Sequence, residues 1–224
     1  VSSPLAFSTV MASRTDAFPT GGPKSWADFW DVKKFPGPRS MRDDPVDNLE
    51  AALLADGVPK DKLYPLDVDR AFRKLDEIYP HVSVWWTTGQ QPAQLLPDKE
   101  VVLATGWNGR FYNIIRKGAP IAFEWEGGIL KLGSFVVPKG SRDAAWGMKI
   151  LAGMADPKAQ AGMSTEIGYS GTNLASDQFV PDDIRPLLPL SPANREKQVW
   201  LAVDWWTKNG AALTERWQKW KLQK

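Results

Sequence analysis

Segments with the period of a β-strand alternate with segments of helical period along most of the 224 residues, and this alternation restricts the possible folds. The strand patterns occupy 5–12, 81–86, 101–107 and 127–138. The helical patterns occupy 26–32, 44–56, 67–80, 91–96, 109–117, 142–163 and 195–224. Strands separated by helices predict an α/β fold in which helices cover both faces of the sheet.

The helix at 44–56 has the clearest boundaries. Asp44 stands at the N-cap position, Pro45 at the first helical position and Asp47 three residues after the cap. Gly57 follows the last apolar residue, where helices commonly end in a left-handed residue. These signals agree on where the helix starts and stops.

Breaks are expected in the two longest helical segments. The segment 142–163 contains Asp156 and Pro157, and proline cannot continue a helix that precedes it. The segment 195–224 contains Asn209 and Gly210, both poor residues for a helix interior. We therefore expect two helices in each segment.

The composition excludes several classes of protein. Apolar residues make up 43% of the chain, which is enough for a substantial core. The formal charge is only +2 and is spread along the chain, so nucleic acid is not expected as a partner. No apolar run approaches the roughly 20 residues of a membrane span.

The sequence offers no pattern for catalysis or for metal binding. Cysteine is absent and His81 is the single histidine, so we expect no metal site and no cofactor. The stretch GYSGTN at 168–173 has its glycines and serine in a different register from the nucleophile elbow G-x-S-x-G. We therefore expect that the protein is not an enzyme.

Three carboxylates, Asp43, Asp44 and Asp47, lie within five residues. One of them is sufficient to cap the helix, a contribution of about 0.5–2 kcal/mol. The other two are not paired with neighbouring lysines in the sequence. The cluster either serves the helix start alone or also binds a ligand ammonium group through charge-assisted hydrogen bonds.

A second candidate site is the stretch WNGR, residues 107–110, which ends a strand pattern and opens a helical one. Open α/β sheets bind their ligands at this kind of strand end. Trp107 could provide an apolar wall, and the planar guanidinium of Arg110 suits a carboxylate. The alternative is that Trp107 lies in the core and Arg110 in solvent.

Five motifs occur in a fixed order and give the chain a family resemblance: SWADFWDV, RDDPVDNLEAAL, WNGR, EGGI with SFVVPKG, and TEIGYSGTNLAS. In this order and at these intervals they resemble the spermidine/putrescine-binding family of periplasmic receptors for ABC importers. The resemblance covers nearly the whole chain. It implies a periplasmic, monomeric protein that binds a small amine or amino acid and delivers it to an inner-membrane ABC permease.

The resemblance also implies a two-lobe periplasmic binding protein fold, similar to type II, in which the lobes close on the ligand. Residues 10–131 are expected to form the first part of the second lobe, and 179–224 its closing helices. Residues 132–178 are expected to return to the first lobe. The chain is expected to lack most of that first lobe. A split fragment of an engineered sensor remains an alternative.

Several ligand-binding residues follow from the resemblance. Asp44 and Asp47 match the acidic positions that hold an amine, Trp107 matches a pocket tryptophan, and Tyr169 matches a ligand-contacting tyrosine. The last helical region is expected to add Asp204 and Trp205, which lie close to a position where the family contributes a polar contact.

The chain departs from the polyamine-binding pattern after EGGI. Lys131 and Gly133 stand where polyamine receptors have tryptophan and aspartate. Because a buried cation needs a counter-charge, the loss of one anion and the gain of a lysine disfavour a dication. We predict a zwitterion such as 4-aminobutyrate, with its ammonium at Asp44 and Asp47 and its carboxylate at Arg110. A polyamine receptor and a tryptophan-rich carbohydrate-active enzyme are the alternatives.

Overall fold

The computed structural model describes residues 2–224, and seven strands within this range form one sheet. The strands are β1 (Ser2–Arg14), β2 (Arg39–Arg42), β3 (Val82–Trp86), β4 (Leu103–Trp107), β5 (Ile121–Phe135), β6 (Ser170–Gly171) and β7 (Val199–Trp200). The strand order is β3-β2-β4-β1-β5-β7, and β6 pairs with β1 off this path.

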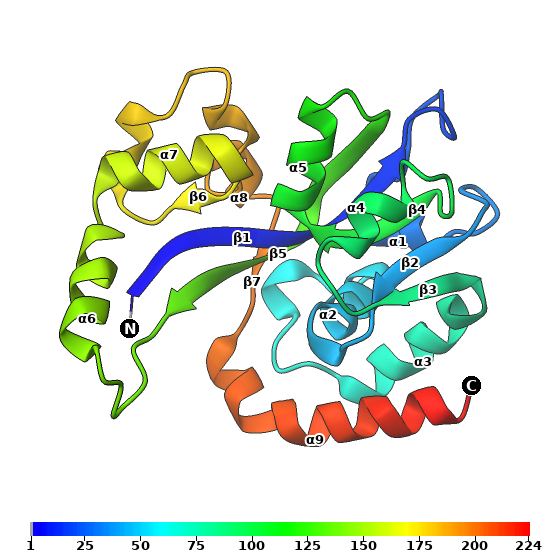
Figure 1. Ribbon diagram of the computed structural model, residues 1–224. Coiled ribbons are helices and arrows are strands. Elements are labelled where there is room, and N and C mark those ends of the chain that lie inside the picture. The colour runs from blue at the N-terminus through cyan, green and yellow to red at the C-terminus, as the bar shows by residue number, and fades with distance from the viewer. Residues whose placement is uncertain (1) are drawn as a thin grey trace.

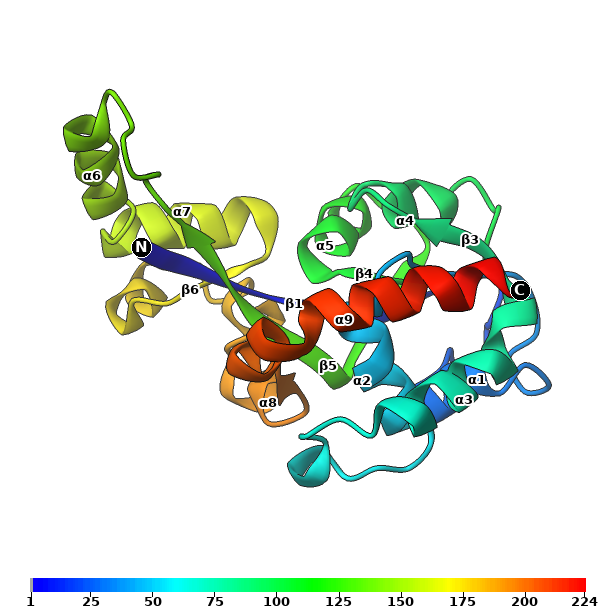
Figure 2. The same ribbon diagram turned by 90° about the horizontal axis from the view of Figure 1, so that it is seen from below.

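Nine α-helices surround the sheet within the described range. They are α1 (Trp26–Trp30), α2 (Pro45–Ala55), α3 (Val68–Ile78), α4 (Gln91–Leu95), α5 (Asn108–Arg116), α6 (Ala144–Gly153), α7 (Pro157–Ile167), α8 (Pro192–Arg195) and α9 (Val203–Leu222). Figures 1 and 2 show α6, α7 and β6 to one side of the molecule and α1–α5 with α9 to the other. The long strands β1 and β5 run between the two sides.

The sheet is mixed because β1 is antiparallel to both of its main neighbours, β4 and β5. The β1–β5 register places Phe7 opposite Lys131 and Thr9 opposite Ile129. By contrast, β2 is parallel to β3 and to β4, so the carboxyl ends of these three strands meet at one edge of the sheet. Arg42, Trp86 and Trp107 are the last residues of these strands.

Two hydrophobic clusters lie on opposite faces of the sheet, as the alternation of strands and helices predicts. Along β1, Met11 belongs to one cluster, and its neighbours Val10 and Ala12 belong to the other. Successive strand residues point to opposite faces, so the two clusters lie on different sides. The first cluster packs under α1, α2, α3 and α9, and the second under α4 and α5.

The C-terminal region differs from the prediction. Residues 199–200 form the short strand β7, which pairs with β5, and α9 continues without a break through Asn209 and Gly210. The Asn209 side chain donates to the Trp205 carbonyl oxygen one turn earlier, so its polar group is satisfied within the helix. Trp206, Leu213 and Trp217 bury the inner face of α9 on both sides of this point. This packing outweighs the low helix propensity of the two residues.

Of two other predicted boundaries, one changed and one was confirmed. β5 begins at Ile121, six residues before the strand pattern that starts at Gly127, since pairing with β1 extends it backwards. The break at Asp156 is confirmed: this residue caps α7, and its side chain accepts from the Ala159 N–H. The division of the chain into lobes at residues 131 and 178 remains a prediction.

Candidate ligand-binding site

The carboxyl ends of β2, β3 and β4 bring one arginine and two tryptophans together. The register pairs Arg42 with Trp86, and the guanidinium carbon of Arg42 lies 5.9 Å from the ring centroids of both Trp86 and Trp107. The two indoles meet edge to face at 5.8 Å. A cation over two aromatic faces is a favourable arrangement for a guanidinium that also remains partly exposed.

The start of α2 is not a regular helical turn. Val46 is extended with ψ 136°, and Asp47 has a left-handed backbone with φ 76°, which is uncommon for a residue with a side chain. The Asp47 N–H donates to Glu50 Oε2 at 2.9 Å, so Glu50 provides the capping contact. The expectation that Asp47 serves as an ordinary first-turn carboxylate is therefore corrected.

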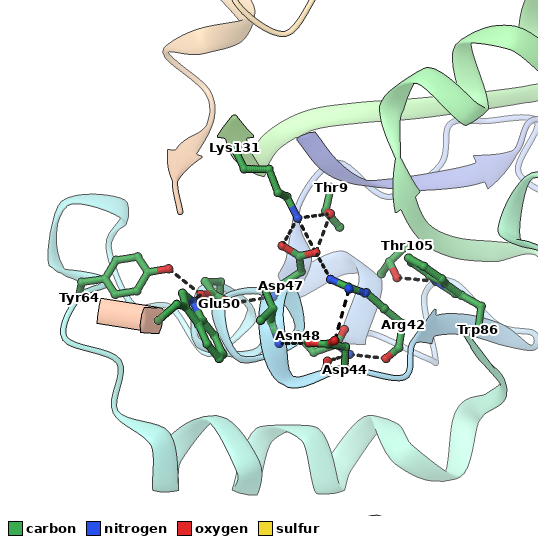
Figure 3. Close-up of polar contacts among 12 residues, drawn as sticks. Thr9, Arg42, Asp44, Asp47, Asn48, Glu50, Tyr64, Trp86, Thr105 and Lys131 are labelled. Carbon is green, nitrogen blue, oxygen red and sulfur yellow. Dashed lines mark hydrogen bonds and ion pairs between the residues drawn. The ribbon is translucent and has the colours of Figure 1, made fainter. Parts of the chain in front are cut away.

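The Asp47 carboxylate instead binds Lys131, as Figure 3 shows. Lys131 Nζ lies 2.5 Å from Asp47 Oδ1 and 2.6 Å from Oδ2, and it donates to Thr9 Oγ1 at 2.9 Å. Thr9 in turn donates to Asp47 Oδ2 at 2.8 Å. Only 2% of the Asp47 side chain and 10% of the Lys131 side chain are exposed. This is a buried ion pair whose two residues come from α2 and β5.

Arg42 contacts both Asp44 and Asp47 at longer range. Its Nη2 lies 3.3 Å from Asp44 Oδ2, and its Nη1 lies 3.4 Å from Asp47 Oδ2. Asp44 also caps α2 by accepting from the Val46 N–H at 2.8 Å. The Asn48 amide donates to the carbonyl oxygens of Arg42 and Asp44 and so fixes the turn between them.

The third carboxylate of the sequence cluster faces elsewhere. Asp43 accepts from the indole N–H of Trp217 at 2.8 Å and lies 3.7 Å from Lys221, and both of these partners belong to α9. The cluster has no neighbouring lysine in the sequence, but the fold gives it basic partners. Arg42, Lys131 and Lys221 supply them, two of these from distant parts of the chain.

Glu50 lies behind Asp47 and is fully buried. Its Oε1 accepts from the Tyr64 hydroxyl at 2.6 Å and from the Trp206 indole at 2.7 Å. Burial raises the pKa of Glu50 to about 7, and the Asp47 charge acts in the same direction. The hydrogen bonds from Tyr64 and Trp206 oppose this rise only in part.

Within the WNGR stretch, Asn108 and Gly109 have structural roles, whereas Arg110 lies at the surface. Asn108 accepts from the Ser8 N–H and donates to the Gly168 carbonyl oxygen, so it ties β1 to the end of α7. A Cβ at Gly109 would lie 2.3 Å from the Ile167 carbonyl oxygen, which explains the glycine. Trp107 packs edge to face on Phe7 at 6.0 Å.

Arg110 is exposed and does not join the aspartates. It lines a small hollow of about 90 Å³ with Gly109, Asn113, Ile167 and Tyr169. Burial raises the pKa of Tyr169, and the nearby Arg110 charge lowers it. Tyr169 also packs on Phe7 at 5.2 Å, so it is joined to Trp107 through that ring.

The two predicted residues of α9 lie apart from the Arg42–Lys131 cluster. Asp204 is exposed in the first turn. Trp205 packs on Tyr64 at 5.8 Å and on Trp206 at 5.3 Å. Trp205 thus packs on Tyr64 and Trp206, the two residues that donate to Glu50.

The structure adds Arg42, Thr9, Trp86 and Glu50 to the residues proposed from the sequence. Arg42 immediately precedes the acidic cluster in the sequence, and this position was the available signal. Thr9 gives no such signal, because its role depends on the register between β1 and β5.

Comparison with known proteins supplies the family. Residues 2–186 match the bacterial extracellular solute-binding proteins. The chain belongs to this family. Its sequence is 36% identical over 203 residues to the gamma-aminobutyric acid-binding protein of Pseudomonas aeruginosa, covering 88% of this chain and 57% of that protein.

Two further relatives extend the comparison. The spermidine/putrescine-binding periplasmic protein of Escherichia coli is 25% identical over 178 residues, covering 79% of this chain and 50% of the relative. The structure of an ABC transporter substrate-binding protein from Bradyrhizobium japonicum matches with a TM-score of 0.92 and 44% identity. It covers 97% of this chain and 69% of that protein. The chain thus spans about half to two thirds of its relatives, and the expected fold and family are confirmed.

Among residues 2–224, no three histidine, cysteine, aspartate or glutamate side chains gather as they would around a metal ion. The same part of the chain contains no helix with the length and apolarity needed to cross a membrane.

Proposed function

We propose that the chain is part of the periplasmic solute-binding receptor of an ABC importer and that it binds a small amino acid, with 4-aminobutyrate as the first candidate. The receptor works as a monomer, delivers its ligand to an inner-membrane permease and performs no chemical step. Ligand capture requires only that the closed form binds the ligand better than the open form.

The observation that carries this proposal is the partly exposed guanidinium of Arg42 between Trp86 and Trp107. A guanidinium has five N–H donors, and the contacts of Arg42 to its two aspartates are long. It can therefore also donate to a ligand carboxylate. The name of the P. aeruginosa relative supports an amino acid of this kind.

Asp44 is the proposed partner for the ligand ammonium. Its side chain is 34% exposed, whereas Asp47 is buried and bound to Lys131. The exposed part of the site therefore presents one cation and one anion, Arg42 and Asp44. A zwitterion complements such a pair, since each of its ends meets an opposite charge. Trp107 and Tyr169 are proposed to provide apolar walls.

Titration calorimetry with 4-aminobutyrate, putrescine and spermidine tests the proposal on the complete receptor of which this chain is proposed to be a part. We expect saturable binding of 4-aminobutyrate, and weakening by about 10- to 100-fold in Arg42→Gln, because a charge-assisted hydrogen bond is lost. Arg110→Gln is the matched control and should bind within about threefold of wild type. Tight putrescine binding with no response to 4-aminobutyrate would contradict the proposal and favour the polyamine receptor.

The comparison of the two arginine variants also decides between two positions for the carboxylate. A larger loss in Arg110→Gln than in Arg42→Gln would place the carboxylate at the hollow beside Tyr169, as the sequence predicts. In that case the ligand would span the distance from Asp44 to Arg110.

A further inference from the structure

We infer that Lys131 is a built-in counter-ion that fills an alkylammonium site formed by Asp47, Thr9 and Phe7, and that it thereby makes the receptor reject cationic ligands. The occupation of this site by Lys131 is independent of the proposed function. The effect of Lys131 on ligand choice rests on the proposed function.

The surroundings of Lys131 Nζ match the needs of a primary ammonium group. Such a group has three N–H donors and no acceptor. The structure supplies three acceptor oxygens, two from Asp47 and one from Thr9, all within 2.9 Å. The Phe7 ring centroid lies 5.5 Å away and adds a cation–π contact.

The register of the sheet explains how the ammonium reaches this place. Phe7 and Lys131 lie opposite each other on β1 and β5, and Thr9 lies two residues further along β1 on the same face. The lysine side chain therefore passes along Phe7 to Thr9 and the start of α2, as Figure 3 shows for its last part.

The backbone of α2 is arranged to present the Asp47 carboxylate to this ammonium. Asp47 keeps a left-handed φ of 76°, a conformation that is unfavourable for a non-glycine residue. Both residues of the pair are almost completely buried. Without Lys131 the Asp47 carboxylate would keep only its long contact of 3.4 Å to Arg42 as an ion pair, and a buried carboxylate with so weak a partner is strongly destabilising.

The consequence is a charge balance that disfavours dications. The charges of Asp47 and Lys131 cancel, and the partly exposed charged groups beside this pair are Asp44 and Arg42. A polyamine would bring two or more ammonium groups to a cluster whose buried carboxylate is already occupied. A ligand with a carboxylate meets no such conflict.

Chemical rescue tests the inference. Lys131→Ala removes three methylene groups and the ammonium, which together correspond to n-propylammonium. Melting temperatures are measured with n-propylammonium chloride and with sodium chloride at equal ionic strength. We expect Lys131→Ala to have a lowered melting temperature that rises saturably by several degrees with n-propylammonium only. Wild type should not respond.

Lys131→Met is the matched control, because it keeps most of the apolar length and leaves no room for the amine. It should be destabilised without rescue. Tetramethylammonium, which has no N–H donor, should not rescue Lys131→Ala. If Lys131→Ala does not fold alone, refolding yield in n-propylammonium replaces the melting temperature, with the same expected direction.

Equal responses of wild type, Lys131→Ala and Lys131→Met to n-propylammonium would overturn the inference. Rescue with no amino acid binding by wild type would leave the ammonium site in place and refute only the proposed function. Putrescine binding tests the effect of Lys131 on ligand choice. Lys131→Ala should gain at least about tenfold in putrescine affinity over wild type.

Discussion

At the scale of single residues, Trp26 and Trp107 differ in the partners of their buried indole N–H groups. Trp26 donates to the Gly127 carbonyl oxygen at 2.8 Å, whereas the buried N–H of Trp107 has no partner among the described residues. A buried donor without a partner loses its hydration with no compensation. The polar group of Trp107 therefore contributes no stability to the unliganded chain.

This difference predicts the outcome of two phenylalanine substitutions. Trp107→Phe should cost about 1–2 kcal/mol less in the free energy of unfolding than Trp26→Phe, because only the second leaves a buried carbonyl oxygen unpaired. Urea unfolding with both variants measures the difference. Equal losses, at unchanged dependence on urea concentration, would show that indole area alone determines the cost.

At the scale of elements, Glu50 connects α2 with α9 and with the segment before α3. One oxygen accepts from Tyr64 and Trp206, and the other accepts from the Asp47 N–H at the start of the same helix. The same carboxylate thus supports the backbone turn that aims Asp47 at Lys131. The ionisation of Glu50 therefore affects the stability of the contacts that join α2 to α9 and to the segment before α3.

The raised pKa of Glu50 predicts a pH dependence with a definite sign. Burial raises this pKa from 4.5 to about 7, so the folded state holds a proton that the unfolded state has already lost between these values. The contribution of Glu50 to stability is fully present below about pH 4.5 and is lost as pH rises to about 7.

Glu50→Gln should remove this part of the pH dependence. Urea unfolding of both proteins at several values between pH 4.5 and pH 8 measures it, and the stability of the variant relative to wild type should rise with pH over the window. A constant difference between the two proteins across this range would contradict the prediction.

At the scale of the whole molecule, α9 closes one side of the main core. Trp217 and Trp220 pack on Phe72 of α3 and on Trp85 of β3, and the last residue of the chain, Lys224, pairs with Asp76 of α3. Figure 2 shows this helix lying along the side that also carries α2 and α3. The C-terminal helix is therefore part of the core.

Two tryptophans of contrasting exposure test this view. Trp217 is fully buried, whereas 66% of Trp146 on α6 is exposed. Trp217→Ala should cost about 3–5 kcal/mol in the free energy of unfolding, because it leaves a large cavity and removes the indole N–H that donates to Asp43. Trp146→Ala should change it by less than about 0.5 kcal/mol. Thermal or urea unfolding gives both values, and a small loss for Trp217 would show that α9 is only loosely attached.

The sequence by itself determined the alternation of strands and helices, the cap at Asp44, the break at Asp156 and the family. The alternation, the cap and the break depend on local chemistry: side-chain period, capping groups and the missing N–H of proline. The family was indicated by the resemblance of the five motifs. Short-range signals wrongly predicted a break at Asn209 and Gly210, where the packing of α9 outweighs the low helix propensity of these residues. They also could not predict β7, a two-residue strand that is defined by its pairing with β5.

Only the tertiary structure decided which charges meet. Asp47 and Lys131 are separated by 84 residues, and their contact depends on the β1–β5 register and on the left-handed backbone at Asp47. Arg42 faces Trp86 and Trp107 because three parallel strands end at one edge of the sheet. The sequence supplied the charged residues, but electrostatic energy depends on distance and burial, and both are set by how distant segments pack.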